Sequence, residues 1–154
     1  MWRIFGLCFF EDKLHFVDET NKTFHREAIE SFLKEKGIGI FDTATAVCRT
    51  KNTASDKDLE IVESTDLDAL LRRIPHCHSV VTTGQKATDV FTAHYGISIP
   101  KVGSYEDFTF RNRPMRLYRM PSSSRAYPMK VERKAEIYRS MFQEVFSETQ
   151  FQSF

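Results

Sequence analysis

Segments with a helical pattern alternate with short apolar runs along most of this chain, and that alternation is the strongest constraint on its fold. Apolar residues spaced three and four apart predict helices at residues 2–10, 23–36, 64–74, 85–95 and 131–145. Short apolar runs predict strands at residues 37–42, 79–83 and 115–118, with a hairpin or a loop before the last of them. This order is typical of a parallel sheet between layers of helices. We therefore predict an α/β fold of three layers, α/β/α, in one domain over residues 1–147, with a frayed tail at 148–154.

Capping and breaking residues predict where two of these helices begin and end. Thr23 has the side chain of an N-cap, and Gly37 is suited to the C′ position where that helix ends. Residues 64–66 predict the start of the next helix, and Pro75 predicts its end. The polar stretch 49–57 between these helices is expected to be a surface loop.

The composition is that of a folded, water-exposed domain. The chain has 154 residues, of which 41% are apolar and 28% are charged, and its net charge is +1. No apolar run has the length of a membrane span, and the apolar start lacks the features of a signal peptide. The three cysteines are odd in number and widely spaced. We expect reduced thiols, a cytoplasmic location and no membrane partner.

The stretch from Arg119 to Pro128 is a short loop that follows the predicted strand 115–118. Pro121 and Pro128 lack backbone N–H groups, so the stretch cannot continue a central strand or sit inside a helix. It contains three serines and Arg125, which are suited to contact phosphate. On composition alone a polar connector is the alternative, and the carboxyl end of a strand is where open α/β folds bind ligands.

Positive charge is concentrated around this loop. Residues 111–130 contain six basic residues and no acidic one. A basic segment beside a serine-rich loop favours contact with a phosphate backbone, and a solvated strand face is the alternative.

Three strand-end segments occur in an order that resembles the uracil-DNA glycosylase superfamily, most closely its hypoxanthine/mismatch-type branch. They are residues 37–44, residues 80–87 including Thr83-Gly84, and the Pro121-Ser122-Ser123-Ser124 loop. The resemblance covers residues 2–146 and depends on the order and spacing of motifs that are individually weak. It implies a DNA repair glycosylase of base excision repair, which flips a deaminated base, hypoxanthine or uracil, out of DNA and hydrolyses its glycosidic bond.

The resemblance also implies roles for individual residues. Asp42 matches the base-reading position, and Thr83-Gly84 match the pair that closes the far side of the base pocket. The loop serines, with Pro121, match the segment that grips DNA phosphates, and Arg125 lies near the intercalating position. The implied partner is DNA with a damaged or mismatched base, and neither a metal nor an organic cofactor is implied. An ionised Asp42 accepts hydrogen bonds only, so a backbone N–H or Thr83 Oγ1 must donate to a base carbonyl.

The chain departs from the family pattern in two places. The first motif of the family precedes an aromatic–Trp pair, and this chain begins at the corresponding position with Met1-Trp2. No residue is therefore assigned the task of placing the attacking water. Met120 stands where classical uracil enzymes have a histidine, although the hypoxanthine-type branch is also apolar there. The family's first central strand is missing as well. We expect a start upstream of Met1; a sheet that closes with another strand order, or a homo-oligomer that covers the exposed sheet edge, are the alternatives.

Several other interpretations stay open at this level. The chain is either an enzyme or a non-catalytic DNA-binding relative of the same fold, and an unrelated small-molecule α/β hydrolase is a third possibility. Asp42 is equally suited to cap the loop after its strand. The sequence His76-Cys77-His78 invites a metal site, but no second ligand pair at zinc spacing accompanies it, so we expect a polar entry into the strand 79–83.

Overall fold

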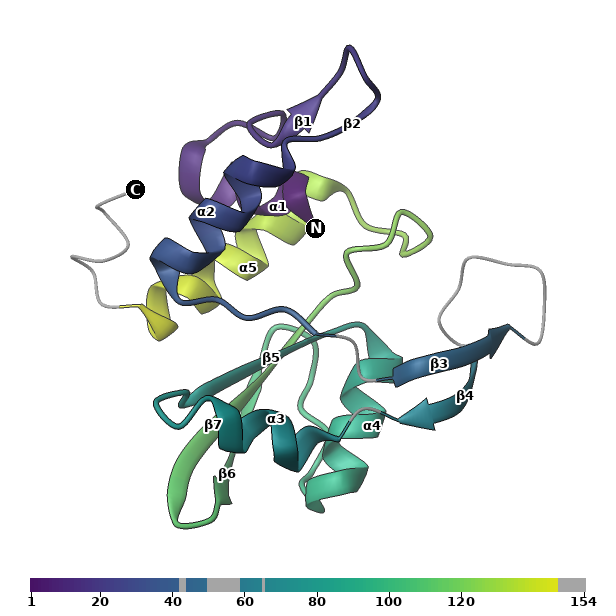
Figure 1. The fold of residues 1–154 in the computed structure, drawn as a ribbon, viewed down its shortest axis with the longest axis vertical. Helices are drawn as coiled ribbons and strands as arrows, with labels where there is room; N and C mark the ends of the chain where they lie inside the picture. Colours follow the sequence, from purple (N-terminus) through teal and green to yellow (C-terminus); the bar gives the residue numbers. More distant parts are fainter. Residues whose placement is uncertain (42–43, 50–58, 65, 147–154) are drawn as a thin grey trace. The chain divides into compact units, whose positions relative to one another are not determined.

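The computed structural model describes residues 1–41, 44–49, 59–64 and 66–146, with the backbone alone for 44–49 and 59–64. The chain divides into two compact units, the first formed by Met1–Phe41 with Pro128–Phe154 and the second by Asp42–Tyr127. In the described ranges the fold is mixed α/β, with five helices and a small mixed sheet of three strands (Figure 1). The prediction of one domain over residues 1–147 stays a prediction.

The first unit is helical and has an aromatic core. It contains α1 (Trp2–Phe10), α2 (Arg26–Lys36), α5 (Val131–Val145) and a short antiparallel hairpin of β1 (Val17–Asp18) and β2 (Thr23–Phe24). The ring of Phe9 lies 4.9 Å from that of Phe32 and 4.7 Å from that of Phe142, so the three helices share one cluster. Cys8 is buried in this unit, and burial raises the pKa of its thiol to about 12.

One predicted helix start in this unit is wrong. Thr23 lies in β2 and pairs with Asp18, and the N-cap of α2 is His25. The helix does end at Gly37, which adopts a left-handed conformation with φ 69°. In the sequence, Thr23 had the hydroxyl side chain of an N-cap residue. The strand that actually contains it has only two residues, too few to show a pattern that would have indicated a strand instead.

The second unit contains a three-stranded sheet and a separate hairpin. The hairpin pairs β3 (Ala44–Arg49) with β4 (Leu59–Ser64). The sheet has the order β5-β7-β6, with β5 (Ser79–Thr83) parallel to β7 (Arg113–Met120) and β6 (Tyr105–Phe110) antiparallel to it. Two helices, α3 (Leu67–Arg73) and α4 (Gln85–Tyr95), precede and follow β5.

The helices α3 and α4 pack on one face of this sheet. Leu67 and Phe91 form a buried cluster with Leu117, and Leu71 forms a second with Phe110 and Met115. Alternation along β7 places Arg116, Tyr118 and Met120 on the opposite face. The apolar spacing in α3 predicted a stripe of Leu67, Leu70, Leu71 and Ile74, of which Leu67 and Leu71 are buried, Leu70 is half-buried and Ile74 is exposed.

The predicted strand at residues 37–42 is wrong over its described part. Residues 38–41 are not in a strand, and Ile40 and Phe41 are 49% and 59% exposed.

The observed sheet is also less parallel than the predicted one, because β6 and β7 form an antiparallel hairpin. Its two-residue turn, Arg111–Asn112, has φ values of 48° and 66°, as a type I′ turn requires. The prediction left a hairpin open as an alternative, and the structure has it.

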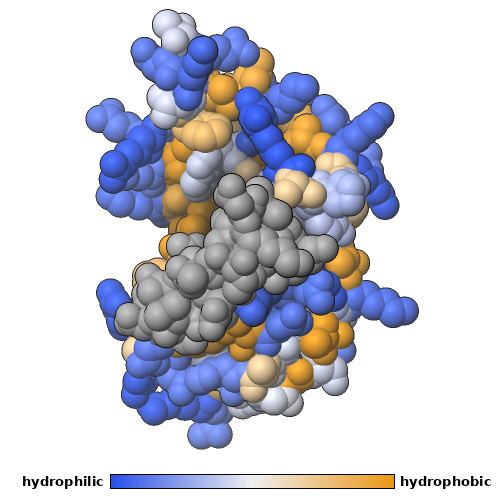
Figure 2. All heavy atoms as spheres, turned by 90° about the vertical axis from the view of Figure 1, so that its right-hand side faces the viewer, coloured by the Kyte–Doolittle hydropathy of each residue, from blue (hydrophilic) through white to orange (hydrophobic). Residues whose placement is uncertain are grey.

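No helix in the described ranges combines the length and the apolar character that crossing a membrane requires. Hydrophilic side chains cover much of the visible face, with apolar residues interspersed among them (Figure 2). The larger exposed apolar side chains include Phe24, Phe41 and Ile99.

Candidate nucleic-acid interface

The parallel pairing of β5 and β7 brings two of the predicted segments together. Thr83, the last residue of β5, lies opposite Met120, the last residue of β7. The next residue, Gly84, donates its backbone N–H to the Met120 carbonyl at 3.1 Å. Thr83-Gly84 and the loop that begins at Pro121 are therefore neighbours at the carboxyl ends of two adjacent strands, where open α/β sheets bind ligands.

Asp42, the predicted base-reading residue, lies outside the described residues. The residues just before it, Ile40 and Phe41, are exposed and form no strand. The described part of the candidate interface is therefore the pair of strand ends at Thr83-Gly84 and Pro121-Arg125.

Gly84 adopts a conformation that only glycine reaches easily. It is the N-cap of α4, with φ 89° and ψ 168°. A Cβ atom at these angles is strained by about 1–3 kcal/mol. The chain needs this turn because it must leave the end of β5 and start α4 in a single residue, so glycine is required here for conformation.

Buried hydroxyl groups lie directly behind this turn. Thr88 Oγ1 donates to the Gly84 carbonyl oxygen at 2.8 Å and lies 2.8 Å from Thr82 Oγ1. Both threonines are buried. Strand alternation directs Thr83 away from them, and its side chain is half-buried.

The first turn of α4 is open to an anion. Gly84 supplies no side-chain cap, and the turn contains no acidic residue. The first N–H groups of this eleven-residue helix have no acceptor within the helix, so they favour negative charge. The N-cap of the helix, Gly84, is hydrogen-bonded to Met120, the residue that precedes the serine loop.

The serine loop is folded on itself by local hydrogen bonds. Ser122 Oγ accepts from the Ser124 N–H at 3.2 Å, and Ser124 Oγ accepts from the Ala126 N–H at 3.2 Å. Pro121 is fully buried and anchors the loop to the end of β7. Two of the three predicted phosphate-binding serines thus shape the loop through turns of the kind that serine favours.

Three polar side chains at this end make no hydrogen bond or ion pair with another described residue: Thr83, Ser123 and Arg125. Ser123 is half-buried and Arg125 is exposed. A hydroxyl donates one hydrogen bond and accepts up to two, and a guanidinium offers a fixed fork of donors. Each of these groups can donate to a carbonyl or phosphate oxygen, but none of them is a base that removes a proton from water at neutral pH.

The other arginines of the basic segment make bonds within the protein. Arg113 donates to the carbonyls of Ile74 at 2.8 Å and Leu71 at 2.9 Å, which lie at the end of α3. Arg116 pairs with Asp107 at 2.8 Å, and Arg119 donates to the Pro100 carbonyl at 3.0 Å. These three arginines therefore already have acceptors within the protein, and alternation along β7 places Arg116 on the opposite face from Arg113 and Arg119. Contact of the basic segment with a phosphate backbone stays a prediction.

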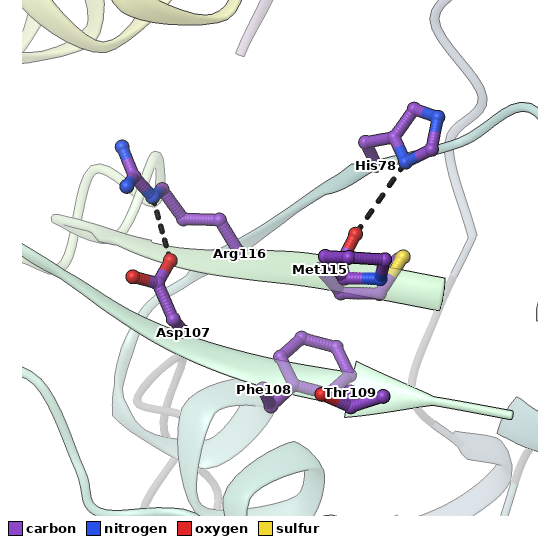
Figure 3. Close-up of a pocket in the computed structure, with 7 residues that line it drawn as sticks. His78, Asp107, Phe108, Thr109, Met115 and Arg116 are labelled. Atoms are coloured by element: carbon purple, nitrogen blue, oxygen red, sulfur yellow. Dashed lines mark hydrogen bonds and ion pairs between the residues drawn. The ribbon is translucent and has the colours of Figure 1, made fainter. Parts of the chain in front are cut away.

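An open hollow of the second unit lies at the opposite end of β5 and β7. This open depression of about 510 Å³ is lined by residues that include His78, Asp107, Pro114 and Arg116. Asp107 and Arg116 point toward each other across it, and His78 reaches the Pro114 carbonyl at 3.4 Å (Figure 3). Its charged groups are already paired, so it offers little to a ligand.

The His76-Cys77-His78 sequence serves the entry into β5. Cys77 Sγ donates to the Ser79 carbonyl at 3.2 Å, and His78 makes the contact just described. Within the described ranges no three His, Cys, Asp or Glu side chains are grouped as metal ligands.

Sequence reasoning missed Thr82 and Thr88. The signal was the repeat of hydroxyl residues around Gly84, in Thr82-Thr83-Gly84 and then Thr88 and Thr92 along one helix. Threonine is a mediocre helix former, so two on the buried side of a short helix suggest a specific hydrogen bond.

Comparisons with known proteins identify no relative, since no protein-family model, no curated protein and no solved structure matches the chain. The functional assignment therefore depends on the site itself.

Proposed function

We propose that this chain binds DNA containing a deaminated base and acts as a DNA glycosylase with the three-layer fold of the uracil-DNA glycosylase superfamily. The observation that carries the proposal is the junction of Thr83-Gly84 and Pro121-Arg125 at two parallel strand ends. There, hydroxyl and guanidinium groups that pair with no other described residue lie beside a helix start without a side-chain cap. This combination suits a flipped nucleotide, which presents a base edge and a phosphate together.

Thr83 is the residue on this strand that can read a base carbonyl. The backbone N–H of Gly84 already donates to Met120, which leaves Thr83 Oγ1 as the available donor. In the proposed complex Thr83 Oγ1 donates to the carbonyl of hypoxanthine or uracil, and Asp42 accepts from the adjacent ring N–H. A base with an amino group at that position would leave the threonine hydroxyl without an acceptor.

Arg125 and Ser123 are assigned to the DNA backbone. Arg125 is exposed, and its guanidinium has no partner among the described groups. A phosphate beside it would also approach the N–H groups at the start of α4 and the Ser123 hydroxyl. These contacts hold the nucleotide but carry no sequence information, as expected for a protein that searches DNA for damage.

The experiment compares binding and base release on labelled duplexes that contain inosine, uracil or no damage. Fluorescence anisotropy measures affinity, and strand cleavage at alkali-labile sites measures base release. We expect tighter binding to the damaged duplexes than to the undamaged one. In Thr83→Val the ratio of these affinities should fall about tenfold, because one hydrogen bond to the base is removed. Thr83→Ser keeps the hydroxyl and should retain the preference. Equal affinity of the wild-type protein for all three duplexes would refute the proposal.

A non-catalytic DNA-binding role is the second candidate. It is favoured by the absence of a general base among the free side chains of the described strand ends. Damage-specific binding without base release would assign the chain to this role, whereas release of hypoxanthine or uracil would exclude it.

A further inference from the structure

We infer that Thr88 is a positioning residue that locks the turn at Gly84 and thereby holds the two halves of the interface together. The inference rests on the proposed function for its effect on DNA, while the lock itself can be measured without DNA.

Both polar groups of Gly84 are held. Its N–H donates to the Met120 carbonyl at 3.1 Å, across to the end of β7. Its carbonyl accepts from Thr88 Oγ1 at 2.8 Å and from the Thr88 N–H at 3.3 Å. The first bond joins β5 to the start of the serine loop, and the second joins the same residue to the first turn of α4.

A second hydroxyl lies beside the first. Thr88 Oγ1 donates its single hydrogen to the Gly84 carbonyl at 2.8 Å, and it can then accept from Thr82 Oγ1, which lies 2.8 Å away. The other acceptor within reach of Thr82 Oγ1, the Tyr118 carbonyl, is farther away at 3.5 Å. Thr88 is completely buried and Thr82 is 4% exposed, so water cannot replace either bond easily. The chain of hydroxyls therefore runs from the core face of β5 to the Gly84 carbonyl.

This arrangement matters because glycine is conformationally free. Gly84 can reach many other backbone conformations, so its neighbours must hold it at φ 89° and ψ 168°. If the Gly84 carbonyl were released, the first turn of α4 and the adjacent Thr83 could shift relative to the loop at Pro121. A displacement of 1 Å in a binding or catalytic arrangement can cost about 100-fold in rate.

Thr92 provides a matched control in the same helix. Its hydroxyl donates to the Thr88 carbonyl at 2.9 Å, and the residue is 3% exposed. It makes the same kind of bond as Thr88, to the carbonyl four residues earlier, but one turn further from the interface. Removing either hydroxyl should have a similar cost for the helix, so only the contact with Gly84 distinguishes the two positions.

The experiment measures the hydrogen exchange of the Gly84 amide by NMR in Thr88→Val, Thr88→Ser and Thr92→Val. We expect exchange at Gly84 to accelerate about fivefold to tenfold in Thr88→Val, from the loss of one buried hydrogen bond, and to change less than twofold in the other two variants. Thr82→Val removes the hydroxyl that neighbours Thr88 and should accelerate exchange at Gly84 to a smaller extent. This variant replaces Thr88→Val in the experiment if Thr88→Val does not fold. Equal acceleration in Thr88→Val and Thr92→Val would overturn the lock.

The same variants are then tested on the inosine duplex. Thr88→Val should bind it about tenfold more weakly than Thr92→Val, and Thr88→Ser should restore wild-type affinity. Faster exchange at Gly84 with unchanged DNA affinity would overturn the link between the lock and the interface. If the wild-type protein binds no DNA, the proposed function and that link fail together, while the exchange data still decide whether Thr88 holds the turn.

Discussion

At the amino ends of β5 and β7, two arginines bond to the protein itself, whereas at the carboxyl ends two hydroxyl groups and one guanidinium make no bond with another described residue. Arg113 binds the last carbonyls of α3, and Arg116 pairs with Asp107. At the other end Thr83, Ser123 and Arg125 have no partner among described residues. Arg125, unlike Arg113 and Arg116, keeps a guanidinium that no other described residue engages, and the proposed phosphate contact requires such a group.

The amino end is also basic, so its charge alone does not distinguish it from the carboxyl end as a site for DNA. Arg72 and Arg111 are exposed and line a second open hollow of about 270 Å³, together with Arg113. Both arginines complement their surroundings, since Arg72 lies in the last turn of α3 and Arg111 lies 5.9 Å from the Phe110 ring. The comparison therefore needs experiments at both ends.

The largest effect is expected at Gly84. Gly84→Ala forces a Cβ into a conformation with φ 89°, at a cost of about 1–3 kcal/mol, and displaces the turn. We expect a lower free energy of unfolding in urea and at least tenfold weaker binding to the inosine duplex. Gly37→Ala, at a left-handed helix end far along the chain, should reduce stability while leaving DNA affinity unchanged. Similar DNA affinities of the two variants would remove the special role of the Gly84 turn.

Substitutions of Arg113 and Arg125 should have opposite effects, the first on stability and the second on DNA binding. Arg113→Gln loses two hydrogen bonds to the end of α3 and should lower the free energy of unfolding by about 1–2 kcal/mol, with DNA affinity unchanged. Arg125→Gln should leave stability unchanged and reduce the slope of log affinity against log salt by about 0.9, the effect of one lost phosphate contact. A stability loss in Arg125→Gln without a change in the salt slope would contradict the assignment of this loop.

The exposed arginines of the amino end should matter less. Arg72→Gln and Arg111→Gln remove charge without removing a described hydrogen bond. We expect DNA affinity within about twofold of wild type at moderate salt, where exposed charges beyond a Debye length of about 8 Å are screened. Titrations at two salt concentrations measure this. A loss as large as that of Arg125→Gln would show that DNA also contacts the amino end.

The smallest expected effect is on the pH dependence of stability. At the end of α4 far from Gly84, hydrogen bonds from His94 and Tyr95 lower the pKa of Asp68 below its usual value. A carboxyl with a lowered folded pKa stabilises the protein above its unfolded pKa, and this stabilisation is lost as pH falls through the folded value. Unfolding in urea between pH 7 and pH 3 should therefore show a weaker pH dependence in Asp68→Asn. No titrating group takes part in the Thr82–Thr88–Gly84 bonds. Hydrogen exchange of the Gly84 amide in Asp68→Asn should therefore equal that of the wild type, and a different rate would show that the two ends of α4 are coupled.

The sequence predicted long, periodic elements well and short ones poorly. The helices α1, α4 and α5 and the strand β5 were located from periodicity, glycine and proline. The two-residue strands β1 and β2 have no measurable period, and β4 lies in a stretch rich in charge. The apolar run at 38–41 suggested a buried strand because periodicity alone cannot separate a buried run from an exposed extended one.

The candidate interface was predictable in position but not in detail. Strand ends can be placed from sequence, so Thr83-Gly84 and the Pro121 loop were each predicted to follow a strand. That these two strands pair in parallel was not predicted. The partners of each arginine were not predictable, because Arg113 bonds to residues 39 and 42 positions away and strand register decides which carbonyls it reaches. The hydroxyl chain was hidden for a related reason, since it depends on the backbone angles of Gly84.

The most direct test of the account is an NMR titration of the wild-type protein with an inosine-containing duplex and with the undamaged duplex of the same sequence. We predict that the amides of Thr83, Gly84, Ser123 and Arg125 shift with the inosine duplex, and that they shift less with the undamaged one. The amides of Arg72 and Arg111 should move little with either duplex. Shifts confined to the amino end, or identical shifts with both duplexes, would contradict the assignment of the carboxyl ends of β5 and β7 as a site for damaged DNA.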